Sequence, residues 1–71
     1  MKTFAEVAQE KDDIERDNKV VIAAIDAAFQ KGDMVEYEKQ MGLLYLIAQR
    51  NQQNTADAFD AFAVAFATTT P

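Results

Sequence analysis

The densest group of side chains that could bind a ligand is an acidic run at residues 10–17, which reads Glu-Lys-Asp-Asp-Ile-Glu-Arg-Asp. Several carboxylates held close together could coordinate a divalent cation. The run lacks the glycine that an EF-hand loop needs for its sharp turn, and a helix would spread its carboxylates around the circumference. Glu15 and Lys19 form an i,i+4 pair in the favourable orientation, which is typical of a solvated helix face. We therefore assign no metal ligand to the run.

Most of the side chains that catalyse reactions near neutral pH are missing, because the chain has no histidine, cysteine, serine or tryptophan. A carboxylate-bridged di-metal centre in a helical bundle would need Glu-x-x-His pairs, which a chain without histidine cannot supply. Tyr37 and Tyr45 lie in or beside apolar stripes, where a tyrosine is usually a core residue. A nucleophile would have no His or Cys to activate it. We predict a protein that is not an enzyme, with no catalytic residue, cofactor or metal ion.

The length of the chain limits its stability. Seventy-one residues form at most one domain, and so short a chain is marginally stable without a disulfide, a structural metal or another subunit. Because cysteine and histidine are absent, association is the remaining common source of stability. We therefore expect a homo-oligomer, or a complex with a protein partner whose identity the sequence does not give.

The net charge of −5 disfavours direct binding to nucleic acid or to an anionic membrane, because both need clustered Lys and Arg. No signal peptide is recognisable at the N-terminus. The longest charge-free run inside the body of the chain, residues 40–49, is too short to span a bilayer. The absence of cysteine fits a cytoplasmic location. We expect a soluble cytoplasmic protein that contacts neither nucleic acid nor a membrane.

The elements that position these residues are predicted to be helices, since the chain has only two glycines and its single proline is the last residue. Thr3 and Glu6 form a capping box, which predicts that a first helix begins directly after Thr3. Gly32 is available for a left-handed C-cap. Asp33, three residues before a glutamate, repeats the capping-box pattern and predicts the start of a second helix.

These signals predict an all-α fold, a small helical bundle with two long antiparallel helices and a shorter C-terminal helix. The polar residues 51–54 are expected to connect the second helix to the third. Gly42 lies inside the second helix, where glycine costs about 1 kcal/mol relative to alanine and usually marks the close approach of another backbone. The predicted segments are helices at residues 4–30, 34–50 and 55–67 and a frayed tail at residues 68–71.

The first predicted helix is longer than the second, about 40 Å against about 25 Å, so residues 4–13 should overhang. Either the overhang docks on another chain, or the first helix breaks at Asp17-Asn18 and its front half folds back. We prefer a continuous first helix, because Arg16, Lys19 and the acids beside them tolerate helix well.

Candidate interaction residues lie on the apolar stripe of the first helix and on a phenylalanine stripe of the third. Lys11 and Asn18 fall at stripe positions, where a polar residue either fixes the register of a coiled-coil seam or simply faces solvent. The phenylalanines are either core residues or a docking surface, and these alternatives merge if a second subunit completes the core. The candidates are Phe4, Val7, Lys11, Ile14, Asn18, Phe59, Phe62 and Phe66.

By exclusion, we expect a non-enzymatic protein-interaction module: an adaptor, inhibitor or regulatory subunit that presents an acidic helical surface. Compact acidic chains without catalytic residues are common among accessory proteins of phages and plasmids. One alternative is a nucleic-acid mimic, whose carboxylates imitate phosphates and block a DNA-binding protein. Another is a structural or assembly component that forms ordered oligomers.

Overall fold

Helix α1, Phe4–Lys31, begins at the capping box that the sequence predicts. The hydroxyl of Thr3 accepts a hydrogen bond from the backbone N–H of Glu6 at 3.2 Å. The carboxylate of Glu6 accepts one in return from the backbone N–H of Thr3 at 3.5 Å. Both bonds satisfy amide groups for which the first helical turn has no internal partner. α1 continues through Asp17 and Asn18 without a break, as expected.

The predicted turn at Gly32 and Asp33 is confirmed. Gly32 has a φ of 70° and a ψ of 19°, the left-handed conformation that glycine adopts without strain. Its N–H donates to the carbonyl of Phe29 at 3.1 Å, and the N–H of Asp33 donates to the carbonyl of Ala28 at 3.0 Å. This pair of bonds is the Schellman motif. The Asp33 carboxylate then accepts a hydrogen bond from the N–H of Glu36 at 3.1 Å, which caps the next helix.

Helix α2, Met34–Thr69, is continuous and includes the four residues expected to connect two separate helices. Residues 51–54 are helical because two of their side chains face α1: Asn54 is buried and Asn51 is half-buried. Gln52 and Gln53 between them are good helix formers. The fold is thus all-helical, with two helices packed against each other, and residues 1–69 contain no separate third helix.

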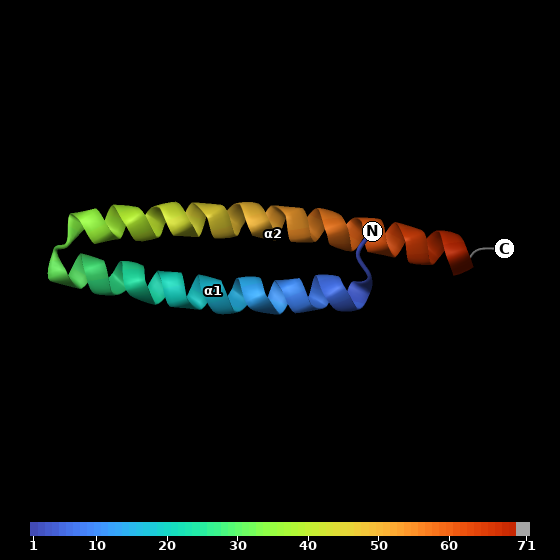
Figure 1. The fold of residues 1–71 in the computed structure, drawn as a ribbon, viewed down its shortest axis with the longest axis horizontal. Coiled ribbons are helices and arrows are strands. Elements are labelled where there is room, and N and C mark those ends of the chain that lie inside the picture. Colours follow the sequence, from blue (N-terminus) through green and yellow to red (C-terminus); the bar gives the residue numbers. More distant parts are fainter. Residues whose placement is uncertain (70–71) are drawn as a thin grey trace.

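The computed structural model describes the backbone of residues 1–69 and the side chains of residues 1–67. The chain forms an antiparallel hairpin with extents of 61 × 15 × 13 Å (Figure 1). Of the predicted frayed tail, residues 68 and 69 continue α2, and residues 70 and 71 lie outside the described residues.

A stripe of residues spaced seven apart forms the seam between the two helices. Its buried members are Val7, Ile14, Val21 and Ala28 in α1 and Ile47, Asn54 and Ala61 in α2. A seven-residue repeat of this kind is typical of coiled-coil packing. The centre of the core contains Ile14, Val21 and Ile47, with Ile25 and Leu44 packed against it. No side chain of the described residues is completely buried, so the core is thin.

The end that overhangs belongs to α2, whereas the front of the first helix was expected to overhang. Residues 4–13 are covered by α2, since the side chain of Asn54 reaches the backbone of Val7 and Lys2 contacts Asp57. The C-terminal end of α2 extends beyond the start of α1 instead (Figure 1). The reason is the continuity of α2 through residues 51–54, which lengthens it past α1. Residues 4–13 are therefore not an overhang that needs another chain to cover it.

Gly42 has no backbone close to it, which corrects the expectation drawn from its position. A Cβ atom built on Gly42 would meet no atom within 4 Å apart from its chain neighbours and the backbone of its own helix turn. We expect Gly42→Ala to raise the free energy of unfolding by about 1 kcal/mol, because alanine lowers the entropy cost of helix formation and meets no obstacle. Urea unfolding followed by circular dichroism measures this change. A loss of stability would contradict it and would indicate that another chain approaches this position.

Candidate interaction surfaces

Polar side chains occupy the seam near the open end of the hairpin. The Lys11 ammonium donates a hydrogen bond to the side-chain oxygen of Asn51 at 2.6 Å. The side-chain nitrogen of Asn54 donates to the backbone carbonyl of Val7 at 2.9 Å. Asn18 is half-buried on the same line of α1 as Lys11. The Lys11 ammonium therefore does not simply face solvent, because it is bound across the seam.

The predicted interaction residues other than Lys11 and Asn18 divide into two groups. Val7 and Ile14 are buried between α1 and α2, so neither side chain is available to a partner, and their assignment to a docking surface is corrected. The phenylalanines remain largely exposed: Phe4 is 50% exposed, Phe59 71%, Phe62 60% and Phe66 62%. The rings of Phe62 and Phe66 stack with centroids 6.1 Å apart. Within a single chain, therefore, these phenylalanines are not core residues.

One side of the hairpin carries two grooves that share Lys11 and run along the seam. The groove at the open end is lined chiefly by apolar side chains, among them Phe4, Ala8, Phe59 and Phe62. The next groove is more polar and includes Glu15, Ala48 and Asn51. Toward the turn, the same lines of the two helices carry Phe29 and Tyr37, whose ring centroids lie 6.2 Å apart.

We call this side the neutral face, because it holds one cation, Lys11, and one anion, Glu15. The other charged residues of α1 and α2 lie on other lines of the two helices, and Lys2 and Asp33 lie outside the helices. The neutral face consists of Phe4, Ala8, Lys11, Glu15, Asn18, Ile22, Ile25 and Phe29 from α1 and Met34, Tyr37, Met41, Leu44, Ala48, Asn51, Thr55, Ala58 and Phe62 from α2.

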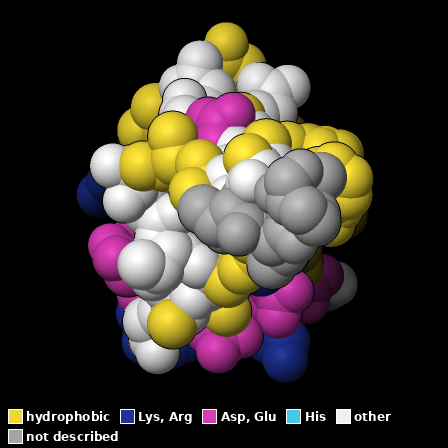
Figure 2. All heavy atoms as spheres, turned by 90° about the vertical axis from the view of Figure 1, so that its right-hand side faces the viewer, with side chains coloured by type: hydrophobic (Ala, Val, Ile, Leu, Met, Phe, Trp, Pro, Cys, Tyr) yellow, Lys and Arg dark blue, Asp and Glu magenta, His cyan; other side chains and the backbone are white. Residues whose placement is uncertain are grey.

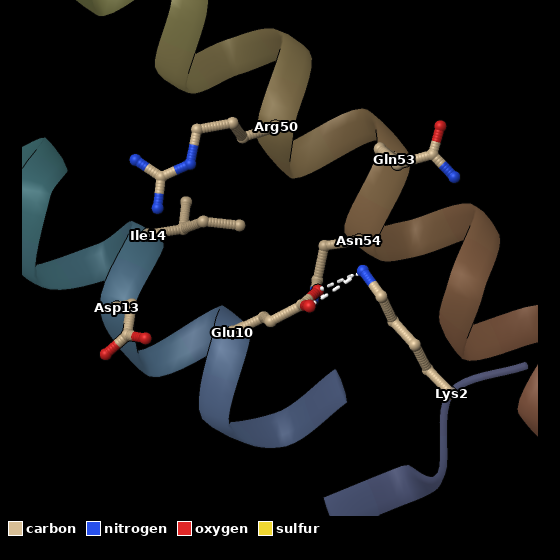
Figure 3. A pocket seen from close by; sticks show the side chains of 7 residues that line it. All are labelled: Lys2, Glu10, Asp13, Ile14, Arg50, Gln53 and Asn54. Carbon is tan, nitrogen blue, oxygen red and sulfur yellow. Dashed lines mark hydrogen bonds and ion pairs between the residues drawn. The ribbon is translucent and has the colours of Figure 1, made fainter. Parts of the chain in front are cut away.

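The opposite side, which we call the charged side, is held together by ion pairs across the hairpin. Lys2 contacts Glu10 at 2.7 Å and Asp57 at 3.1 Å, and Arg50 contacts Asp17 at 2.8 Å. Figure 3 shows Lys2 reaching from the N-terminal segment toward Glu10 in the groove between α1 and α2. The end-on view of Figure 2 shows Asp, Glu, Lys and Arg gathered mainly over α1. The charged side is defined by Lys2, Glu10, Asp13, Asp17, Val20, Leu43, Leu46, Arg50, Gln53 and Asp57.

Hydrogen bonds shift the pKa values of three groups on the charged side. The bond from Arg50 lowers the pKa of Asp17 below its ordinary value of 3.8. Bonds from Gln53 and then Lys2 lower the pKa of Asp57 in the same way. The pKa of Lys2 is raised from 10.5 by its bonds to Glu10 and Asp57. Each shift favours the charged form of the group.

These shifts predict a specific acid sensitivity. Because the folded-state pKa of Asp17 is lower than its unfolded value, ionised Asp17 stabilises the fold above pH 3.8, and this contribution is lost as the pH falls through the lowered pKa. We expect Asp17→Asn to make the decline of stability with acid shallower than in the parent chain. Thermal unfolding measured along a pH series checks this, with Asp12→Asn at an exposed position of α1 as the matched control. Parallel curves for Asp17→Asn and the parent would contradict it.

The acids among the described residues do not build a metal site. Within the described part of the chain, no three acidic side chains come close enough together to hold a metal ion. The carboxylates of the acidic run point to different sides of α1, and several are paired with cations: Asp13 lies 3.5 Å from Arg16, and Asp17 contacts Arg50.

Neither helix has a described segment long and apolar enough to cross a membrane. What the surfaces offer chemically is apolar contact and charge.

The sequence interpretation missed two sets of residues. Asn51 and Asn54 continue the three-and-four spacing of Leu44 and Ile47 toward Ala58, and that spacing was the signal that the connector is helical. Val20, Leu43 and Leu46 form an apolar patch on the charged side. No local signal identifies them, because exposure depends on where the partner helix lies.

Comparison of the chain with protein families, with curated proteins and with solved structures finds no match. A functional assignment therefore depends on the two surfaces described above.

Proposed function

We propose that this chain is a non-enzymatic, cytoplasmic protein-interaction module, an adaptor, inhibitor or regulatory subunit that binds a partner through its charged side. The observation that carries the proposal is the patch of Val20, Leu43 and Leu46, whose side chains are 65%, 40% and 52% exposed. Asp17 and Arg50 line the same groove as this patch. An apolar centre with a charged rim is the usual anatomy of a protein interface.

The charges around the patch define the partner's chemistry. Glu10, Asp13 and Asp17 follow one another along the same side of α1, and the chain as a whole carries a net charge of −5. A complementary surface has an apolar patch bordered by Lys and Arg. The same net charge disfavours an anionic lipid surface as the occupant.

The alternative of nucleic-acid mimicry is less well supported. A mimic needs a row of unpaired carboxylates that take the place of phosphates. Here cations interrupt the row: Glu10 contacts Lys2, Asp13 contacts Arg16 and Asp17 contacts Arg50. These pairs favour recognition of a protein surface over imitation of a nucleic-acid backbone.

Affinity capture from the source cell with matched charge variants tests the proposal. We expect the parent chain to retain a protein at low salt and to release it as salt rises, because exposed charge pairs are screened. Asp13→Lys should abolish retention, since it reverses the charge of the acid one helical turn before Asp17, which lines the groove of the patch. Glu38→Lys makes the same charge change at an exposed position outside the charged side, and should leave retention unchanged.

Equal retention by Asp13→Lys and Glu38→Lys would contradict the proposed surface. Turnover of a substrate that depends on one side chain of this protein would contradict the non-enzymatic assignment.

A further inference from the structure

We propose that the neutral face is covered by a second copy of this chain, so that two hairpins form a four-helix bundle. This inference goes beyond the proposed function, because it concerns the other side of the molecule and names its occupant. It leaves the charged side of both copies free for the partner proposed above.

The hairpin exposes more surface than a compact monomer of its mass would. The chain exposes 5375 Å², whereas a compact monomer of 7.9 kDa exposes about 4,400 Å². Its radius of gyration is 16.7 Å, against about 11 Å for a compact domain of this length. The excess area of about 1,000 Å² is close to the roughly 800 Å² that each partner buries in a stable complex. A single hairpin therefore leaves uncovered about as much surface as one dimer interface removes.

The distribution of charge favours the neutral face for contact between two copies. Two copies that each carry a net charge of −5 repel one another unless they meet through a surface that excludes the acids. The neutral face carries only Lys11 and Glu15, whose charges cancel. The charged side carries four acids, Glu10, Asp13, Asp17 and Asp57, against two cations, Lys2 and Arg50. Self-pairing through the charged side would bring like charges together, whereas self-pairing through the neutral face would not.

The apolar composition of the neutral face suits the core of a four-helix bundle. In a four-helix bundle each helix contributes its inner stripe and one flank to a shared core. Here the flank is already apolar at both ends, with Phe4 and Phe62 near the open end and Phe29 and Met41 toward the turn. Phe62 is 60% exposed and Phe29 is 65% exposed in the single hairpin. A two-fold pair would bury both ends and enclose the polar contact of Lys11 with Asn51.

Sedimentation equilibrium of the purified full-length chain tests the inference. We expect a mass of two chains at micromolar concentration. Phe62→Glu should raise the dissociation constant at least about 100-fold, because each dimer loses two buried phenyl rings. Leu46→Glu makes an equivalent change on the charged side, where Leu46 is 52% exposed, and should leave the dimer intact.

A thiol-protection experiment covers the case in which Phe62→Glu fails to fold. The chain contains no cysteine, so Ala8→Cys and Ala27→Cys each introduce a single thiol. Both alanines are exposed in α1, but Ala8 lines a groove of the neutral face and Ala27 lies on the other flank of the helix. We expect the thiol at position 8 to be protected from alkylation at high protein concentration and to react on dilution. The thiol at position 27 should react at every concentration.

A monomer at several hundred micromolar would overturn the inference, and so would a dimer that Leu46→Glu dissociates but Phe62→Glu does not. Equal alkylation at positions 8 and 27 in the dimer would also overturn it. Salt separates this inference from the proposed function: added salt should release the partner from the charged side but leave the dimer intact, because the neutral face associates through apolar contact.

Discussion

Replacing Ile47 with alanine is expected to lower the free energy of unfolding by about 2–4 kcal/mol, because it leaves a cavity in the centre of the seam. Ile47 is 7% exposed and packs with Ile14 and Val21. A domain of this length has a total stability of roughly 4–10 kcal/mol, so the loss is a large fraction of the whole. Urea unfolding followed by circular dichroism measures the change.

Leu46→Ala is the matched control for this prediction. Leu46 is adjacent in sequence but 52% exposed, so its truncation should cost less than about 1 kcal/mol. Equal losses for the two substitutions would mean that the seam between α1 and α2 is not the main source of stability.

Replacing Asn54 with aspartate is expected to lower the free energy of unfolding at neutral pH by about 2–4 kcal/mol. Asn54 is 4% exposed and donates a hydrogen bond to the Val7 carbonyl at 2.9 Å. An ionised carboxylate cannot donate this bond, and it would place a buried negative charge against the carbonyl oxygen. Burial should raise the folded-state pKa of the new carboxyl above its unfolded value. The loss of stability should therefore shrink as the pH falls from neutral toward about 4.

Asn54→Leu separates the charge effect from the loss of the amide. Leucine leaves the Val7 carbonyl with its own helical hydrogen bond and adds apolar contact to the seam, so the melting temperature should rise. The register of α1 against α2 should become less well defined, because a polar seam residue that specifies it is gone. Spin-label distances between the helices measure the register. Equal stability of Asn54→Asp and Asn54→Leu at neutral pH would contradict the burial of this position.

Local signals predicted the beginning of both helices and the turn between them. The capping box at Thr3 and the Gly32-Asp33 turn involve residues no more than five apart, so they depend little on the rest of the chain. The connector expected at residues 51–54 shows where local evidence was insufficient. Four polar residues are typical of a loop when their surroundings are unknown. Here Asn51 and Asn54 find hydrogen-bond partners on α1, which makes a buried polar helix turn possible.

The exposure of the candidate interaction residues was predicted only in part for a related reason. The phenylalanine stripe is visible in the sequence, but whether Phe59 and Phe62 are core or surface depends on how many helices surround them. With two helices, each neighbour covers one stripe of the other, and the flanks remain exposed. Val7 and Ile14 lie on the covered stripe, and Phe4 lies on the flank.

By itself the sequence determined the helical class, the Thr3 cap, the turn and the excess of acids, because each depends on residue type or on neighbours along the chain. Only the tertiary structure decided that α2 is unbroken and that the charged residues lie mainly away from the neutral face. Those features depend on contacts between residues more than forty positions apart, such as Asn54 with Val7. When two helices pair, one stripe of each is buried in the seam. The flanks of that seam then form the neutral face and the charged side.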